Sequence, residues 1–210
     1  IIPVMVTPFT DDNKIDYDSL DRLIEWYIGH GVDALFAVCQ SSEMIFLSLE
    51  ERVALSEHVV KRVNKRIPVI SSGHISDDLD EQKRELVAMS KTGADALVLV
   101  TNHLDPQQQG SETFYRYLNE LLDVLPADLP LGIYECPVPY RRLLSDDEIS
   151  YCANTGRFVV IKDVSCDLAT VQRRVALVEG TPLSIVNANA AIAYPAMLSG
   201  ARGFCGVMAN

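Results

Sequence analysis

Hydrophobic residues along this chain fall into two alternating kinds of segment. Eight short apolar stretches have the length and composition of strands buried on both faces, and segments with a helical period lie between them. The expected strands are residues 1–9, 34–40, 67–74, 96–102, 130–136, 158–164, 183–189 and 203–210. The expected helices are residues 17–30, 49–63, 79–92, 112–125, 146–154, 169–179 and 191–199.

Local signals support these boundaries and indicate a repeated unit. Ser48 with Glu51, and Ser145 with Glu148, have the spacing of capping boxes. HGVDALFAV, TGADALVLV and, more loosely, SGARGFCGV repeat a helix-ending glycine followed by an apolar strand. Repeated helices and doubly buried strands require a parallel sheet covered by helices. Eight such units in a chain of about 200 residues favour a closed (β/α)8 TIM barrel over an open sheet.

Composition and charge narrow the domain organisation and the classes of partner. We expect one TIM-barrel domain over residues 1–210, truncated after the eighth strand because no helix follows it. The net charge of −11 argues against a nucleic-acid partner. No apolar run reaches the roughly 18 residues of a membrane span. The five cysteines show no paired spacing, so we expect a cytoplasmic protein without a disulfide framework.

One charged residue stands inside a predicted buried strand. Lys162 follows four apolar residues in the stretch 158–164, and an ammonium group is rarely buried without a partner. Asp163 is the next residue and should face the opposite side of the strand. We expect burial to lower the pKa of Lys162, which yields an amine able to form a Schiff base with a ketone. The alternative is a lysine whose charged end reaches solvent.

Other candidate residues lie at the carboxyl ends of the predicted strands, where TIM-barrel active sites are built. They are His74, His103, Cys39, Cys136 and Cys205. Imidazole and thiolate groups are zinc ligands, so a metal-dependent lyase is one alternative function. The chain contains no H-x-H or C-x-x-C spacing to strengthen it.

Several motifs, spread over essentially all 210 residues, are shared with one family. They are PVMVTPFT, SSE-x-x-x-LSLEER, IYECP, VIKDVSCDL and GARGFCGVMAN. Together they resemble the dihydrodipicolinate synthase/N-acetylneuraminate lyase family of Schiff-base class I lyases. The resemblance implies a TIM barrel, a homodimer or homotetramer, and a pyruvate-like 2-oxo acid as the small-molecule substrate. It also implies that no cofactor is needed, because the protonated imine serves as the electron sink.

The same resemblance assigns roles to individual residues. Lys162 falls on the Schiff-base lysine, and Tyr134 on a tyrosine that transfers protons to and from the substrate. Ser41 and Ser42 lie in the loop that holds the substrate carboxylate. The backbone carbonyls of Ala188 and Cys205 match pocket-lining positions, and Arg141 or Arg142 could reach the distal end of a substrate.

Three departures from synthase-type relatives bear on the reaction. Cys39 and Ser42 replace two glycines of the carboxylate loop, and the distal arginines stand in a shifted register. A tyrosine pair is replaced by His103 and Leu104, so that relay is missing or His103 takes its place. We therefore expect an aldolase or dehydratase, a carbon–carbon or carbon–oxygen lyase, acting on a 2-oxo acid derived from a sugar acid. The alternatives are 4-hydroxy-tetrahydrodipicolinate synthase itself and a homologue that binds a 2-oxo acid without catalysis.

Overall fold

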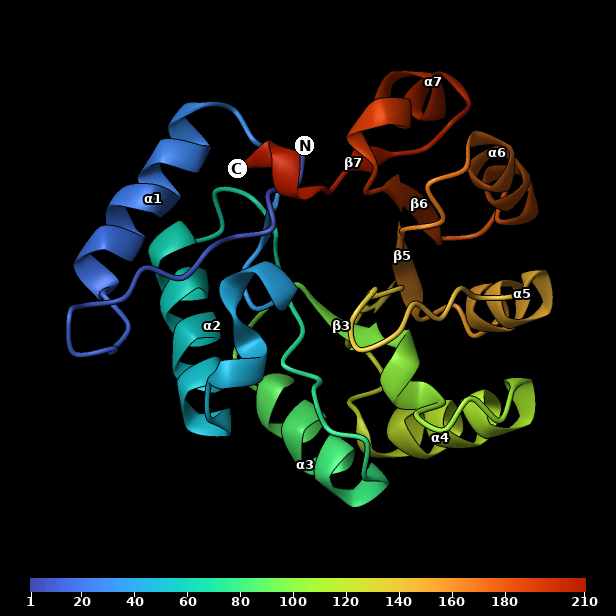
Figure 1. Ribbon diagram of the computed structural model, residues 1–210, viewed down its shortest axis with the longest axis horizontal. Coiled ribbons are helices and arrows are strands. Elements are labelled where there is room, and N and C mark those ends of the chain that lie inside the picture. The colour runs from blue at the N-terminus through green and yellow to red at the C-terminus, as the bar shows by residue number, and fades with distance from the viewer.

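Seven parallel strands, hydrogen-bonded in chain order, form a curved sheet around the centre of the molecule (Figure 1). The computed structural model describes residues 1–210. The strands are β1 (Leu35–Phe36), β2 (Val69–Ser71), β3 (Ala96–Val100), β4 (Leu131–Tyr134), β5 (Phe158–Asp163), β6 (Ser184–Asn187) and β7 (Gly203–Phe204).

The N-terminal stretch takes the eighth strand position and joins the two edges of this sheet. Val4 forms a parallel bridge with Phe36 of β1. On the other side, the Ile2 amide donates to the carbonyl of Phe204 in β7 at 2.9 Å. Because one segment pairs with both edge strands, the sheet is closed. The predicted (β/α)8 TIM-barrel fold is therefore confirmed.

Seven helices surround the strands (Figure 1). They are α1 (Tyr17–Gly29), α2 (Leu49–Val63), α3 (Leu79–Met89), α4 (Ser111–Val124), α5 (Asp146–Asn154), α6 (Leu168–Leu177) and α7 (Ala193–Leu198). Both predicted capping boxes form, at the starts of α2 and α5. None of the helices combines the length and the apolar character that crossing a membrane requires.

Several predicted segments are longer than the observed ones because tight turns begin where the strands leave the barrel. The prediction of a strand over 34–40 gives way to a 3-10 turn at Gln40–Ser42. The prediction over 203–210 ends at Phe204, and Val207–Ala209 form another 3-10 turn. The predicted helix 191–199 divides into the turn Ala190–Ile192 and α7. These turns build the carboxyl-terminal mouth of the barrel.

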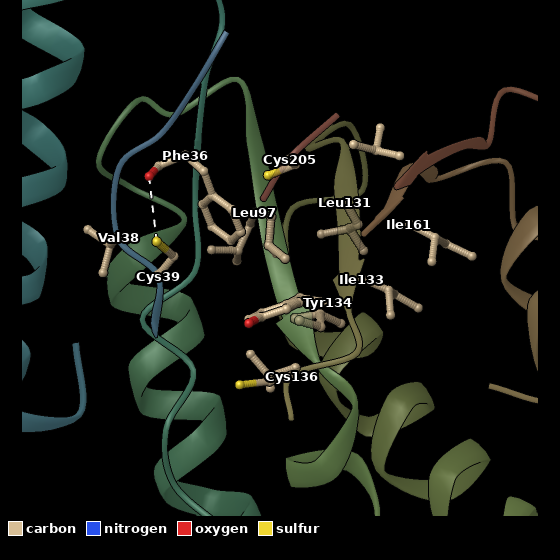
Figure 2. Close-up of a cluster of buried hydrophobic side chains, with 14 of the residues drawn as sticks. Phe36, Val38, Cys39, Leu97, Leu131, Ile133, Tyr134, Cys136, Ile161 and Cys205 are labelled. Atoms are coloured by element: carbon tan, nitrogen blue, oxygen red, sulfur yellow. Dashed lines mark hydrogen bonds between the residues drawn. The ribbon is translucent and has the colours of Figure 1, made fainter. Parts of the chain in front are cut away.

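Apolar side chains from both faces of the strands form one buried cluster, which fills the barrel and the layer between the strands and the helices. Figure 2 shows Phe36, Leu97, Leu131 and Ile133 within this cluster, and all of them belong to the buried hydrophobic core. Gly132 allows β3, β4 and β5 to approach closely, since a Cβ there would lie 2.8 Å from Val160 Cγ1 and 3.1 Å from Val98 Cγ2. The packed interior leaves the mouth as the place for chemistry.

Candidate active site

Tyr134 and Lys162 meet at the carboxyl ends of β4 and β5. They are direct partners in the register of the two strands. The Lys162 Nζ lies 4.1 Å from the centroid of the Tyr134 ring and 5.5 Å from that of Phe36. Lys162 is 8% exposed and Tyr134 is 5% exposed. The structure thus brings both residues together on the inner face of the barrel.

The Lys162 ammonium has no carboxylate partner inside the barrel. No salt bridge of the structure includes it, whereas Asp163 pairs with Arg174 of α6 on the other face of β5. The aromatic faces of Tyr134 and Phe36 are what Nζ contacts instead. An amine held in this way is available for reaction, because no ion pair must first be broken.

Three thiols surround the Tyr134 ring: Cys39, Cys136 and Cys205 (Figure 2). Burial raises the pKa of the Cys205 thiol to about 11 and also raises that of Cys39, although the nearby Lys162 ammonium opposes both shifts. Cys39 and Cys205 are therefore neutral thiols at neutral pH and poor nucleophiles. Burial, and next the Cys136 thiol, raise the pKa of Tyr134 as well. The resting phenol is thus protonated and able to donate a proton.

The two serines of the Cys39–Glu43 loop differ in the hydrogen bonds that their hydroxyls make. The Ser42 hydroxyl accepts from the Cys39 amide at 2.6 Å and donates to the Cys39 carbonyl at 2.8 Å. The Ser42 carbonyl accepts from the hydroxyl of buried Thr7 at 2.8 Å, so the polar groups of Ser42 stabilise the turn itself. The Ser41 hydroxyl makes no hydrogen bond within the chain, which leaves it for a ligand. Between the two candidates for the substrate carboxylate, the geometry favours Ser41.

Gln40 is a site residue that the sequence analysis did not select. The Cys136 thiol donates to its side-chain Oε1 at 3.6 Å, which places the amide beside the thiol that contacts Tyr134. The only available signal was its position directly before Ser41. Its direction is set by the 3-10 turn that begins at Gln40, which the sequence pattern did not reveal.

Ala188 and Cys205 complete the neighbouring strand ends. The Ala188 amide donates to the Asp163 carbonyl at 3.0 Å, and the Cys205 amide donates to the Asn187 carbonyl at 2.8 Å. A Cβ at Gly206 would lie only 2.5 Å from the Ala188 carbonyl oxygen. Glycine at 206 therefore permits the two strand ends to close around that carbonyl.

The two candidate distal arginines have different surroundings. Arg142 binds Glu148 at 2.7 Å and Asp105 at 3.0 Å, and both carboxylates are almost fully buried. This guanidinium already has its partners. Arg141 is exposed, and its Nη1 donates to the Val164 carbonyl at 3.4 Å. It is thus the arginine at the mouth, and it contacts Val164, two residues beyond Lys162.

The two strand-end histidines lie together, with ring centroids 5.2 Å apart. His74 Nδ1 accepts from the Val100 amide at 3.0 Å and its Nε2 bonds Gln82 at 2.8 Å, while burial lowers its pKa to about 3. His103 bonds Asp77 at 2.7 Å, and no hydrogen bond joins it to Tyr134 or Lys162. No three His, Cys, Asp or Glu residues are arranged to hold a metal ion, so the donor set gives no support to the metal-dependent alternative.

Comparisons with known proteins show the family to which the chain belongs. The model of the dihydrodipicolinate synthetase family matches residues 1–210. The 4-hydroxy-tetrahydrodipicolinate synthases of Neisseria gonorrhoeae and Bacillus subtilis are each 30% identical, with 98% of this chain and 69% of theirs aligned.

Solved structures give the same relationship. Dihydrodipicolinate synthase from Bacillus anthracis superimposes with a TM-score of 0.87 at 27% identity, and covers 99% of this chain and 69% of that one. The chloride-inhibited enzyme of Acinetobacter baumannii, solved with pyruvate, has a TM-score of 0.86 at 29% identity and the same coverage. The matched motifs, the closed barrel and the family match over residues 1–210 lead to one conclusion: the chain belongs to the dihydrodipicolinate synthetase family.

Proposed function

We propose that this protein is a class I lyase that forms a Schiff base between Lys162 and a pyruvate-like 2-oxo acid. The observation that carries the proposal is the unpaired Lys162 Nζ, 4.1 Å from the centroid of the Tyr134 ring at the barrel mouth. A buried amine beside a protonated phenol has the two groups that imine formation requires, a nucleophile and a proton donor. Pyruvate binding by the Acinetobacter relative supports the choice of substrate class.

The reaction begins when the Lys162 amine attacks C2 of the ketone to give a carbinolamine. The C2 hydroxyl takes a proton from Tyr134 and leaves as water, which yields a protonated imine. Tyr134, now a phenolate, takes the proton of a C4 hydroxyl as the C3–C4 bond breaks, and the electron pair moves into the imine as an enamine. In a dehydratase it would instead remove a C3 proton before a hydroxyl leaves. The imine alone serves as the electron sink, so these steps call for no cofactor.

Substrate orientation is assigned to the Cys39–Glu43 loop. We place the substrate carboxylate at Ser41, whose hydroxyl has no partner within the chain, and the Ala188 carbonyl on the same rim. In this proposal Ser42 stabilises the turn of the loop, and Cys205 forms part of the pocket wall. The distal part of the substrate extends towards Arg141 at the mouth.

An aldolase or dehydratase is favoured over a synthase with a second, charged substrate. Arg142 is paired with Asp105 and Glu148 and is not free to bind a substrate. Of the two arginines, only the exposed Arg141 is left to bind a second carboxylate. His103 is held by Asp77 and stands apart from Tyr134, so it does not supply the relay. A sugar-acid-derived 2-oxo acid, with neutral hydroxyls on its distal carbons, suits this surface. 4-Hydroxy-tetrahydrodipicolinate synthase activity is the second candidate, because the 30% identical relatives carry that name.

The protein is also proposed to work as a homodimer or homotetramer. Ile45 and Phe46, adjacent on the turn after the carboxylate loop, are 43% and 77% exposed, and contiguous apolar side chains on a surface mark interfaces. Sedimentation velocity measures the assembly directly. A monomer at micromolar concentration would contradict this part of the proposal.

Borohydride trapping tests the function. Incubation with pyruvate and borohydride should add to the protein the mass of pyruvic acid less one oxygen atom, and the adduct should disappear in Lys162→Met. Lys83→Met is the matched control, because Lys83 is also partly buried but pairs with Glu120; it should label as the wild type does. An adduct that survives Lys162→Met, or no adduct at all, contradicts the proposal. A panel of sugar-derived 2-oxo acids, followed for pyruvate or water release, then identifies the substrate.

A further inference from the structure

Behind the reacting pair, one buried arginine joins two buried carboxylates. Arg174 of α6 is 1% exposed, and Glu135 and Asp163 are fully buried. The Arg174 guanidinium donates to Glu135 Oε1 at 2.7 Å and to Glu135 Oε2 at 2.9 Å. The same guanidinium donates to Asp163 Oδ2. This bidentate, charge-assisted arrangement is the strongest geometry available to an arginine.

The two carboxylates belong to the residues that directly follow the reacting pair. Glu135 follows Tyr134, and Asp163 follows Lys162. Since side chains alternate along a strand, Tyr134 and Lys162 face the barrel interior while Glu135 and Asp163 face α6. Arg174 therefore holds both strands from behind at the rung next to the reactive one.

The backbone ladder between β4 and β5 weakens at this point. The Glu135 amide reaches the Lys162 carbonyl at 3.4 Å, the long end of a hydrogen bond. Side chains continue the connection: Glu135 accepts from the Val164 amide at 3.2 Å and from the Leu144 amide at 2.8 Å. Arg174 also donates to the Leu144 carbonyl at 3.0 Å. The cluster thus connects β4, β5, α6 and the segment before α5 at the point where the backbone hydrogen bond between the two strands is long.

We propose that Arg174 is a positioning residue that keeps the Tyr134 ring against the Lys162 amine by clamping Glu135 and Asp163. Its consequence for catalysis rests on the proposed function. Without the guanidinium, two buried carboxylates face each other and must repel or take up a proton. The ends of β4 and β5 would then separate, and Tyr134 would move away from Lys162. A lysine at 174 carries the charge but not the planar fork that holds both carboxylates.

Arg174→Met and Arg174→Lys test this inference against a matched control, Arg52→Met. Arg52 forms a similarly buried pair with Glu85 at 3.0 Å, between α2 and α3 and without contact to β4 or β5. Its loss should cost comparable stability while leaving the reacting pair in place. Thermal unfolding of all three variants measures that structural loss.

The first readout is the position of Lys162 itself and needs no catalysis. Reductive methylation with 13C-formaldehyde labels lysine amines, and the Lys162 signal is assigned by its absence in Lys162→Arg. Because Nζ lies over the Tyr134 ring, the ring current should move this signal upfield. The shift should be lost in Arg174→Met, partly retained in Arg174→Lys and unchanged in Arg52→Met. An unchanged shift in both position-174 variants overturns the inference. If Arg174→Met does not fold, Arg174→Lys decides.

The second readout is exchange of the pyruvate methyl protons in D2O, which requires proton transfer from the imine. We expect Arg174→Met to exchange about 10²-fold more slowly than Arg52→Met, as for a misplacement of about 1 Å. Equal exchange rates in these two variants would contradict a positioning role. The wild type could fail to exchange pyruvate protons while its 13C-methylated Lys162 still shows the upfield shift that Arg174→Met loses. In that case the positioning inference stands and the proposed function fails.

Discussion

Tyr134→Phe separates the proposed proton transfer from the packing of the site. The substitution removes one oxygen and leaves the ring, which lies 6.2 Å from the Phe36 ring and 4.1 Å from the Lys162 Nζ, measured from its centroid. The Tyr134 hydroxyl makes no hydrogen bond of good geometry within the fold. The free energy of unfolding should therefore change by less than about 1 kcal/mol.

The catalytic effect of the same change should be much larger. General acid–base catalysis by one side chain contributes about 10²–10⁴-fold, equivalent to about 3–5 kcal/mol of activation free energy. Rapid-quench borohydride trapping follows imine formation at Lys162, and urea unfolding gives the stability. We expect imine formation to slow by that factor while the adduct still accumulates at long times. An unchanged trapping rate would show that the phenol does not supply the proton, and a large loss of stability would show that it serves the fold.

Three further predictions follow from the surroundings of the site. Burial lowers the pKa of His74 from 6.5 to about 3, so between these two pH values His74 is protonated only in the unfolded chain. The free energy of unfolding should therefore fall by on the order of 4 kcal/mol as the pH drops from about 6.5 towards 3. Urea titrations of His74→Gln should lack this loss. Gly206→Ala places a Cβ 2.5 Å from the Ala188 carbonyl, so we expect about 1–3 kcal/mol of destabilisation by thermal unfolding and a raised KM for the 2-oxo acid. Arg142→Met should cost about 3–5 kcal/mol of stability, whereas Arg141→Met should alter stability by less than about 0.5 kcal/mol and raise KM only for substrates with a distal anion; equal effects of the two would refute the distinction.

The fold could be predicted from the sequence because local sequence signals mark the helices and strands of this barrel. The capping serines Ser48 and Ser145 mark helix starts, and the apolar stretches are short enough to be distinguished from the helices between them. The closing contact of the N-terminal stretch with β7 follows once eight strands are expected in one barrel. Lys162 was recognisable because a charge inside an apolar strand needs a physical reason.

The details of the site were less accessible, because they depend on side-chain direction in turns. Ser42 was predicted to help bind the substrate carboxylate, and the sequence did not reveal that the left-handed backbone at Glu43, with φ of 60°, closes a turn in which the Ser42 hydroxyl bonds Cys39. Gln40 points to Cys136 for the same reason. The pairing of Arg174 with Glu135 joins positions 39 residues apart, and no local pattern connects them.

A crystal structure of the protein reduced with borohydride in the presence of pyruvate would test the central claim most directly. We expect continuous density between the Lys162 Nζ and C2 of the former ketone, with the carboxylate at Ser41 and the Tyr134 hydroxyl facing the reduced carbon. Pyruvate bound with the Lys162 amine free, or joined to a different lysine, would contradict it.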